Sequence, residues 1–168
     1  EPTWRGGEQQ LLYLLEGLRG RGVDSALVAQ KGSPLAARAR SRGLDVREMR
    51  MRGEVDVPAM LRLARIIDRE RYSIVHAQTS HAHTLGSVAA RLLAFRRRPR
   101  MLVTRRVDFS IFRNSFFGLN RFKYLYGVDA YVTVSDAIRR VMIRDGVPAS
   151  RIETVHSGVD VANVESAP

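Results

Sequence analysis

Two adjacent glycines precede an apolar, helix-like stretch near the start of the chain, in RGGEQQLLYLLEGL. Gly6 and Gly7 lack a Cβ atom, so the backbone there can approach a ligand closely and can adopt positive φ. The leucines that follow recur at helical spacing and predict a helix over residues 8–20. Its free N–H groups and positive dipole end would face the glycines, an arrangement that binds phosphate. The pair therefore predicts a phosphate site, with a plain strand–helix turn as the alternative.

A second group of polar residues follows the apolar stretch YSIVHAQ, which predicts a strand over residues 72–78. In open α/β sheets, ligands bind beyond the carboxyl ends of the strands. Gln78, His81 and His83 are therefore candidate site residues, whereas His76 lies within the strand and is interpreted as a core histidine. We expect no metal here, because residues 81 and 83 point about 200° apart on a helix. No carboxylate is near them in sequence.

The stretch TRRVDF ends the next predicted strand, over residues 100–106. Arginine guanidinium groups bind phosphate or carboxylate through two parallel hydrogen bonds, so Arg105 and Arg106 are candidate ligands for an anionic substrate. Asp108 follows them closely. It is either a further site residue or a purely structural ion-pair partner of one arginine, and the sequence leaves both interpretations open.

Aromatic and basic residues alternate over residues 109–126. The pattern fits a helix packed into the core, a contact with an anionic membrane or a lipid-linked ligand, or stacking on single-stranded nucleic acid. The whole chain carries 28 basic and 17 acidic side chains, a net charge of +11. That charge favours polyanionic partners, or simply keeps the protein soluble.

Predicted strands and helices alternate along the chain. The helices are expected over 33–42, 57–71, 81–94 and 136–145, and the strands over 23–30, 44–51, 72–78, 100–106, 129–135 and 151–160. This order predicts an α/β fold with a Rossmann-like, mostly parallel sheet and helices on both faces. Because a glycine-rich turn of this kind usually follows a strand, we expect a first strand before Glu1, outside the sequence.

The composition narrows the class of protein further. Hydrophobic residues make up 45% of the chain, enough to bury a core, and no run of 18 apolar residues is present. The absence of cysteine excludes disulfides and thiolate metal sites. We expect a cytoplasmic protein, peripheral to the inner membrane face if it binds lipid.

Four segments in order, residues 2–10, 74–91, 103–109 and 131–160, resemble the N-terminal domain of family 4 glycosyltransferases. The last segment, YVTVSDAIRRVMIRDGVPASRIETVHSGVD, is the most specific of them. The resemblance implies one half of a GT-B fold, in which two Rossmann-like domains face a cleft. Residues 1–160 would be the acceptor-side domain, and 161–168 a linker or truncated tail toward a missing C-terminal domain.

The resemblance also implies residue roles. Gly6 and Gly7 match the loop that approaches the donor diphosphate. Gln78 stands where many members carry a histidine that faces the reacting sugar; glutamine can hydrogen-bond a hydroxyl but cannot titrate. His81 or His83 would then have to substitute for that histidine.

Two further groups of residues follow from the same resemblance. The acceptor would meet Arg105, Arg106, Asp108 and His83. Ser157, Gly158 and Asp160 would form the hinge between the two domains.

The reaction so implied is the transfer of a sugar from a nucleotide-diphosphate sugar to an acceptor hydroxyl, with retention and without a metal or other cofactor. The acceptor would be a sugar, or a lipid-linked or lipopolysaccharide-type molecule, and this chain alone would be inactive. The alternative is a non-catalytic, basic Rossmann-like module that binds nucleic acid or another anionic partner. We expect no specific nucleic acid, because no RRM-type or KH-type motif is present.

Overall fold

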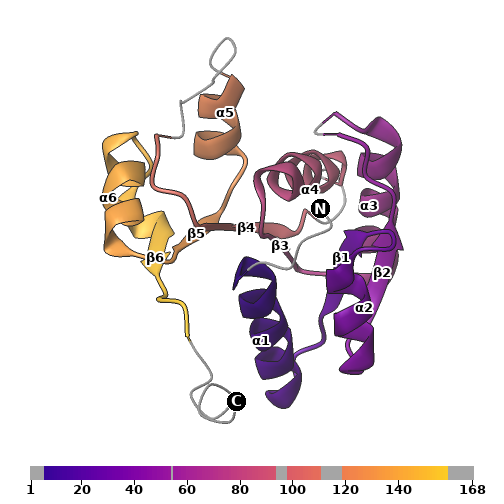
Figure 1. The fold of residues 1–168 in the computed structure, drawn as a ribbon. Coiled ribbons are helices and arrows are strands. Elements are labelled where there is room, and N and C mark those ends of the chain that lie inside the picture. The colour runs from indigo at the N-terminus through magenta and orange to yellow at the C-terminus, as the bar shows by residue number, and fades with distance from the viewer. Residues whose placement is uncertain (1–5, 54, 94–97, 111–118, 159–168) are drawn as a thin grey trace.

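The structure is a computed structural model, and it describes residues 6–53, 55–93, 98–110 and 119–158 (Figure 1). Its helices are α1 (Gly6–Gly20), α2 (Pro34–Ser41), α3 (Val57–Glu70), α4 (Ser80–Leu92), α5 (Leu119–Tyr126) and α6 (Asp136–Arg144), with a 3-10 turn, η1, at Ala149–Arg151. Its strands are β1 (Ala26–Gln30), β2 (Asp45–Met49), β3 (Ile74–Ala77), β4 (Arg100–Arg105), β5 (Ala130–Thr133) and β6 (Ile152–Thr154). The predicted alternation of strands and helices is confirmed.

Four helices begin at a side-chain cap directly after a strand or loop. Ser33, Asp56, Thr79 and Ser135 each accept a hydrogen bond from the backbone N–H three residues later. These caps satisfy N–H groups that have no partner within the helix, and they fix the residue at which each helix begins. The polar residues that follow β3 and β5 are therefore held at the carboxyl ends of those strands.

All strand pairs among the described residues are parallel, but they form two sheets rather than the single sheet that the sequence predicts. One sheet pairs β1 with β2, and the other has the order β3-β4-β5-β6. No backbone hydrogen bonds join them in the described residues. Helix α4 shares a core cluster with each sheet: Leu85 belongs to the cluster against which Val28 of β1 packs, and Ala89 to the cluster against which Val75 of β3 packs. The strand expected before Glu1 lies outside the sequence and stays a prediction.

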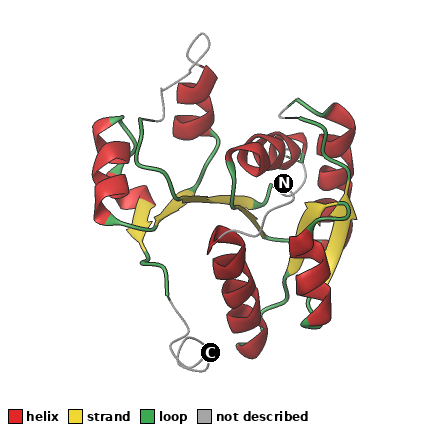
Figure 2. Ribbon diagram, in the orientation of Figure 1, coloured by secondary structure: helices red, strands yellow, loops and turns green. Residues whose placement is uncertain are grey.

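Helices cover both faces of the four-stranded sheet, as predicted. In Figure 1, α1 lies below this sheet, and α4 and α5 lie above it; Figure 2 shows the same layers by type of element. Within the described residues, no helix combines the length and apolarity needed to cross a bilayer. Residues 111–118 of the basic aromatic segment lie outside the described residues, and the part that is described ends in α5.

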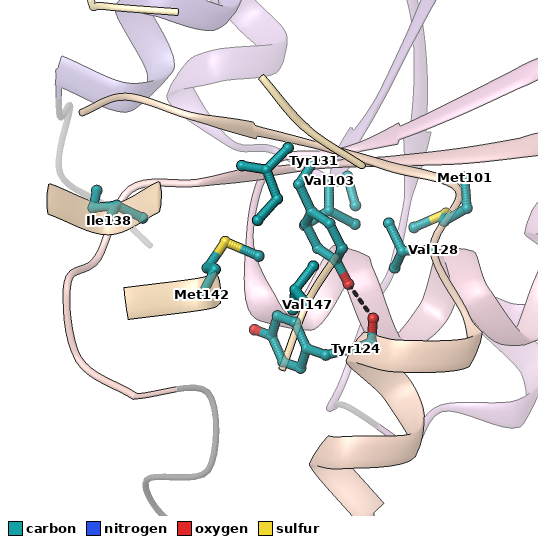
Figure 3. Packing of buried hydrophobic residues seen from close by; sticks show 10 residues of the cluster. Met101, Val103, Tyr124, Val128, Tyr131, Ile138, Met142 and Val147 are labelled. Carbon is teal, nitrogen blue, oxygen red and sulfur yellow. Dashed lines mark hydrogen bonds between the residues drawn. The ribbon is translucent and has the colours of Figure 1, made fainter. Parts of the chain in front are cut away.

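The largest core cluster lies between α5, α6 and strands β4 to β6 (Figure 3). Tyr131 is 1% exposed, and its hydroxyl donates a 2.6 Å hydrogen bond to the backbone carbonyl of Tyr124. The Tyr124 and Tyr131 rings stack with centroids 6.1 Å apart. Met142 of α6 is fully buried against this cluster, so the aromatic pair and the helix stabilise each other.

We expect Met142→Ala to lower the free energy of unfolding by about 2–5 kcal/mol, because it leaves a cavity in a closed core. Ile143→Ala is the matched control, since Ile143 follows directly on α6 and is 36% exposed; it should cost about 1 kcal/mol or less. Urea denaturation of both variants measures the difference. Equal losses would contradict the packing of α6 described above.

Candidate functional site

The N-terminus of α1 carries both candidate phosphate-binding glycines. Helix α1 is described from Gly6 onward and not only from Glu8, so both glycines lie in the first described turn. Neither glycine has a positive φ. The freedom to adopt positive φ is therefore not used here. The glycines leave the first described turn without a Cβ, beside their own N–H groups, which have no partner among the described residues.

Arg106, which follows β4, lies directly against Gly7. A Cβ atom built on Gly7 would sit 3.5 Å from Arg106 Cδ and 3.6 Å from its Nε. A Cβ on Gly6 would meet nothing within 4 Å. Both are ordinary van der Waals distances, so the Arg106 side chain packs beside Gly7, and a side chain larger than a Cβ at this position would meet it.

Gln78, which follows β3, fastens the Arg106 guanidinium. One guanidinium nitrogen donates to the Gln78 backbone carbonyl at 3.1 Å, and the other donates to Gln78 Oε1 at 2.7 Å. Arg106 Nε is buried and has no hydrogen-bond partner among the described residues. Burial lowers the pKa of Arg106 from its usual value, but arginine stays charged at neutral pH.

The network continues from Gln78 into the sheet. Gln78 Nε2 lies 3.0 Å from His76 Nε2, which in turn lies 2.7 Å from Thr104 Oγ1. Because the amide oxygen of Gln78 accepts from Arg106, its amide nitrogen donates to His76, whose Nε2 is then an acceptor. Burial and, second, the Arg106 charge lower the pKa of His76 to about 4, so the ring is neutral at pH 7.

These contacts place two positive ends side by side, the guanidinium of Arg106 and the N-terminal dipole of α1. Among the described side chains, no carboxylate forms an ion pair with Arg106. A small anion at this position would be attracted by both groups and would meet the Gly6 and Gly7 N–H donors, which have no partner among the described residues. The arrangement can therefore hold a phosphate and stabilise negative charge that develops on it.

Arg105 has a different environment from its neighbour. It is 6% exposed; its guanidinium donates to the Tyr124 hydroxyl at 2.9 Å and to the Phe109 carbonyl, and it lies over both aromatic rings. Consecutive residues at a strand end point to opposite faces, which separates the two arginines. Arg105 supports the segment after β4 and does not reach the network around Gln78.

The remaining candidates do not gather around Arg106. His83 is fully buried, lies edge-on to Tyr124 with ring centroids 4.8 Å apart, and has its pKa lowered to about 3 mainly by burial. His81 is half-buried, and its Nε2 finds no partner among the described residues. Asp108 is exposed and pairs with neither arginine in the described structure, which disfavours its structural interpretation.

The segment after β6 is attached to α1 by a glutamine that the sequence analysis did not single out. Gln10 Nε2 donates to the Gly158 carbonyl at 2.5 Å, and Gly158 N–H donates to Gln10 Oε1 at 3.2 Å. Gln10 lies one turn after Gly6 and Gly7, so the expected hinge is joined to the helix of the anion site. Ser157 is exposed, and Asp160 lies outside the described residues.

The half-buried His76 and the buried His83 predict that stability falls in acid. Both have pKa values below the usual 6.5 in the folded chain, so between pH 6.5 and about 4 the unfolded chain binds more protons. The free energy of unfolding therefore falls as the pH falls through this window. His83→Phe should keep the aromatic contact with Tyr124 and flatten this slope in urea denaturation, whereas His156→Gln, at an exposed position, should not. The same slope in His83→Phe and the wild type would contradict the prediction.

Comparisons with known proteins add an independent result. The family described as Glycosyltransferase Family 4 matches residues 4–163, and no curated protein sequence matches the chain. Anabaena HepE in complex with UDP is 15% identical, with a TM-score of 0.75 over 96% of this chain and 43% of its own. A glycosyltransferase from Rickettsia africae is 18% identical, with a TM-score of 0.73 over 97% of this chain and 44% of its own.

A UDP-N-acetylglucosamine 2-epimerase from Rickettsia bellii shares the fold as well, with 12% identity and a TM-score of 0.63 over 92% of this chain and 43% of its own. The fold alone therefore does not distinguish a transferase from an epimerase. This chain spans less than half the length of each of these structures. The family match extends over nearly the whole chain and includes all of the contacts described above, and the chain accordingly belongs to glycosyltransferase family 4, with the parallel α/β fold of one GT-B domain.

Proposed function

We propose that this chain is the N-terminal domain of an enzyme that transfers a sugar from a nucleotide-diphosphate sugar to an acceptor hydroxyl, with retention. The observation that carries the proposal is the convergence of the α1 N-terminus, Arg106 and Gln78 beyond the carboxyl ends of β3 and β4. Arg106 donates to two Gln78 oxygens at 2.7 and 3.1 Å, and its side chain lies beside Gly7. Family membership supports the transferase chemistry. The Anabaena structures solved with UDP and with UDP-glucose support a nucleotide sugar as the donor.

In this proposal the site stabilises the leaving diphosphate. Negative charge accumulates on the phosphate oxygens as the bond to the sugar breaks, and preorganised cations and N–H donors lower the energy of that state. The first-turn N–H groups at Gly6 and Gly7 supply the donors, and Arg106 supplies the cation. The resemblance placed Arg106 with the acceptor. We propose instead that Arg106 binds the donor phosphate.

Gln78 acts in this scheme as a positioning residue. Its side-chain oxygen and nitrogen are both engaged, by Arg106 and His76, so it orients the guanidinium. It carries no titratable group, and proton handling falls to groups outside this network. His81, the nearer of the two α4 histidines to Gln78 in sequence, stays the candidate for that role, since His83 is sealed in the core.

The rest of the active site is proposed to lie in a second domain. Residues 1–160 would form the acceptor-side domain and 161–168 the linker, with Ser157, Gly158 and Asp160 at the hinge. Because the chain spans less than half of its structural relatives, we propose that it is inactive alone. We propose no metal or cofactor besides the donor substrate.

The acceptor is proposed to be lipid-linked or of lipopolysaccharide type and to reach the protein at the inner membrane face. Arg105 is buried, so its role toward the acceptor is to hold the segment that begins at Asp108. Phe109 and Tyr126 are 44% and 67% exposed and lie at the two ends of the basic aromatic segment. Exposed aromatics beside cations suit a membrane interface.

The donor proposal is tested by assaying the intact protein against UDP-, GDP- and ADP-sugars, with NMR of the product to read the anomeric configuration. We expect transfer with retention from at least one donor. An inverted product would overturn retention. Turnover of none, together with salt-dependent binding of unrelated oligonucleotides, would favour the non-catalytic module instead.

The phosphate site is tested by Gly7→Val in the same protein. The branched side chain would displace Arg106, and donor affinity should fall about tenfold or more because a charge-assisted hydrogen bond is lost. Gly20→Val is the matched control on α1, since an added Cβ there meets nothing within 4 Å. Isothermal titration with UDP compares them. Unchanged affinity in Gly7→Val, with the helix content preserved, would remove Arg106 from the donor site.

The membrane proposal predicts retention of the protein by vesicles that contain anionic lipid at low salt, and release at high salt, because exposed charges are screened. Phe109→Ser combined with Tyr126→Ser should weaken retention several-fold by removing apolar contacts. Vesicle sedimentation measures both effects. No retention of the wild-type protein at low salt would end the membrane proposal.

A further inference from the structure

An open surface pocket of about 470 Å³, called the cavity below, lies beyond the carboxyl ends of β1 and β2, away from the Arg106 network in sequence. Four of the side chains that line it are cationic: Lys31, Arg50, Arg62 and Arg65. Its volume is in the range of small-molecule sites, about 300–1,000 Å³. No sequence motif marks these residues as a site.

Three elements bring the four cations together. Lys31 and Arg50 are the first residues after β1 and β2, and the parallel register of these strands sets their backbones side by side, with Lys31 N–H donating to the Met49 carbonyl at 3.0 Å. Arg62 and Arg65 are three residues apart on α3 and thus share one face of that helix. The clustering follows from the fold, because the residues come from separate parts of the chain.

Positive charge predominates in the lining of this cavity, although the Arg62 charge helps backbone hydrogen bonds, the larger cause, to lower the pKa of the Asp56 carboxyl at the start of α3. None of the four cations forms an ion pair or a side-chain hydrogen bond within the described part of the chain. Glu48, the acidic residue of the lining, pairs instead with Arg40 at 2.8 Å. Other arginines do find carboxylates, as Arg42 does with Glu16 at 3.1 Å.

The remaining lining is apolar. Met49, 5% exposed, and Ile66 complete the cavity. Apolar side chains beside convergent charged groups are typical of sites that hold a ring with an anionic substituent. Guanidinium groups in particular bind phosphate oxygens in pairs.

We propose that this cavity binds a phosphate group carried by the acceptor, so that the acceptor is a phosphorylated saccharide or lipid. The designation of the ligand as acceptor rests on the proposed function, whereas phosphate binding itself does not. The site is separate from that of the donor diphosphate, which belongs to α1, β3 and β4. The enzyme would then hold two anionic groups, one at each set of strand ends.

The test uses the intact protein and titrates it with inorganic phosphate and glucose 6-phosphate at low salt, followed by NMR. In the double variant Arg62→Gln/Arg65→Gln, affinity should fall about tenfold or more. Arg69→Gln/Arg140→Gln removes the same charge from exposed positions outside the cavity and should change affinity less than about twofold. An equal loss in both double variants would overturn the site.

A third variant separates this cavity from the donor site. The Arg106→Gln variant should still bind phosphate at the cavity. This remaining binding should be lost when Arg62 and Arg65 are also replaced by Gln. If all phosphate binding disappears with Arg106→Gln alone, the cavity proposal fails while the donor proposal stands. If Arg106→Gln leaves UDP binding unchanged, the donor proposal fails independently.

Vesicles that contain phosphatidic acid identify the source of the phosphate. Vesicle binding that is lost in Arg62→Gln/Arg65→Gln, and kept in the control, assigns the site to a lipid headgroup. If the Arg62→Gln/Arg65→Gln variant loses only the binding of glucose 6-phosphate, the site binds a soluble or exposed sugar phosphate. Wild-type protein that binds neither probe overturns the proposal.

Discussion

The two hydrogen bonds from Arg106 to Gln78 hold the candidate site together. They join the carboxyl ends of β3 and β4 and lay a guanidinium over the first turn of α1, so that residues 7, 78 and 106 meet. A cation beside the positive end of a helix is unfavourable unless it is held there or neutralised. Gln78 holds it, and its own orientation is fixed in turn by the neutral His76. The described part of the chain thus holds a preformed positive site beside the first-turn N–H groups of α1.

Arg105 and Arg106 illustrate how one strand end serves two purposes. Arg105 is buried among Tyr124 and Phe109 and joins the segment after β4 to α5. Arg106, on the opposite side, reaches Gln78 and α1. The fixed position of Arg106 therefore depends on a core in which Arg105, Tyr124 and Tyr131 are packed together. A substitution in that core is expected to shift Arg106, although none of the core side chains would touch the substrate.

The arginine and lysine side chains differ in whether they pair with a carboxylate. Several surface arginines pair with nearby carboxylates, such as Arg40 with Glu48 and Arg42 with Glu16. The cations at the ends of β1 and β2, and Arg106 at the end of β4, do not pair with carboxylates in the described structure. The net charge of +11 is thus partly concentrated at strand ends, where α/β proteins bind ligands.

Local sequence patterns determined the order of the elements, the caps at Ser33, Asp56, Thr79 and Ser135, and the parallel α/β class, because periodicity and capping act over a few residues. The same patterns marked Gly7, Gln78 and Arg106 as candidate site residues, because Gly7 stands at the start of a helix and the other two stand at the ends of strands. They could not separate Arg105 from Arg106 or show that His83 is sealed in the core, because burial depends on contacts with α5. Nor could they assemble Lys31, Arg50, Arg62 and Arg65, or join Gln10 to Gly158, 148 residues away. Those arrangements exist only once distant segments pack, and tertiary structure alone decided them.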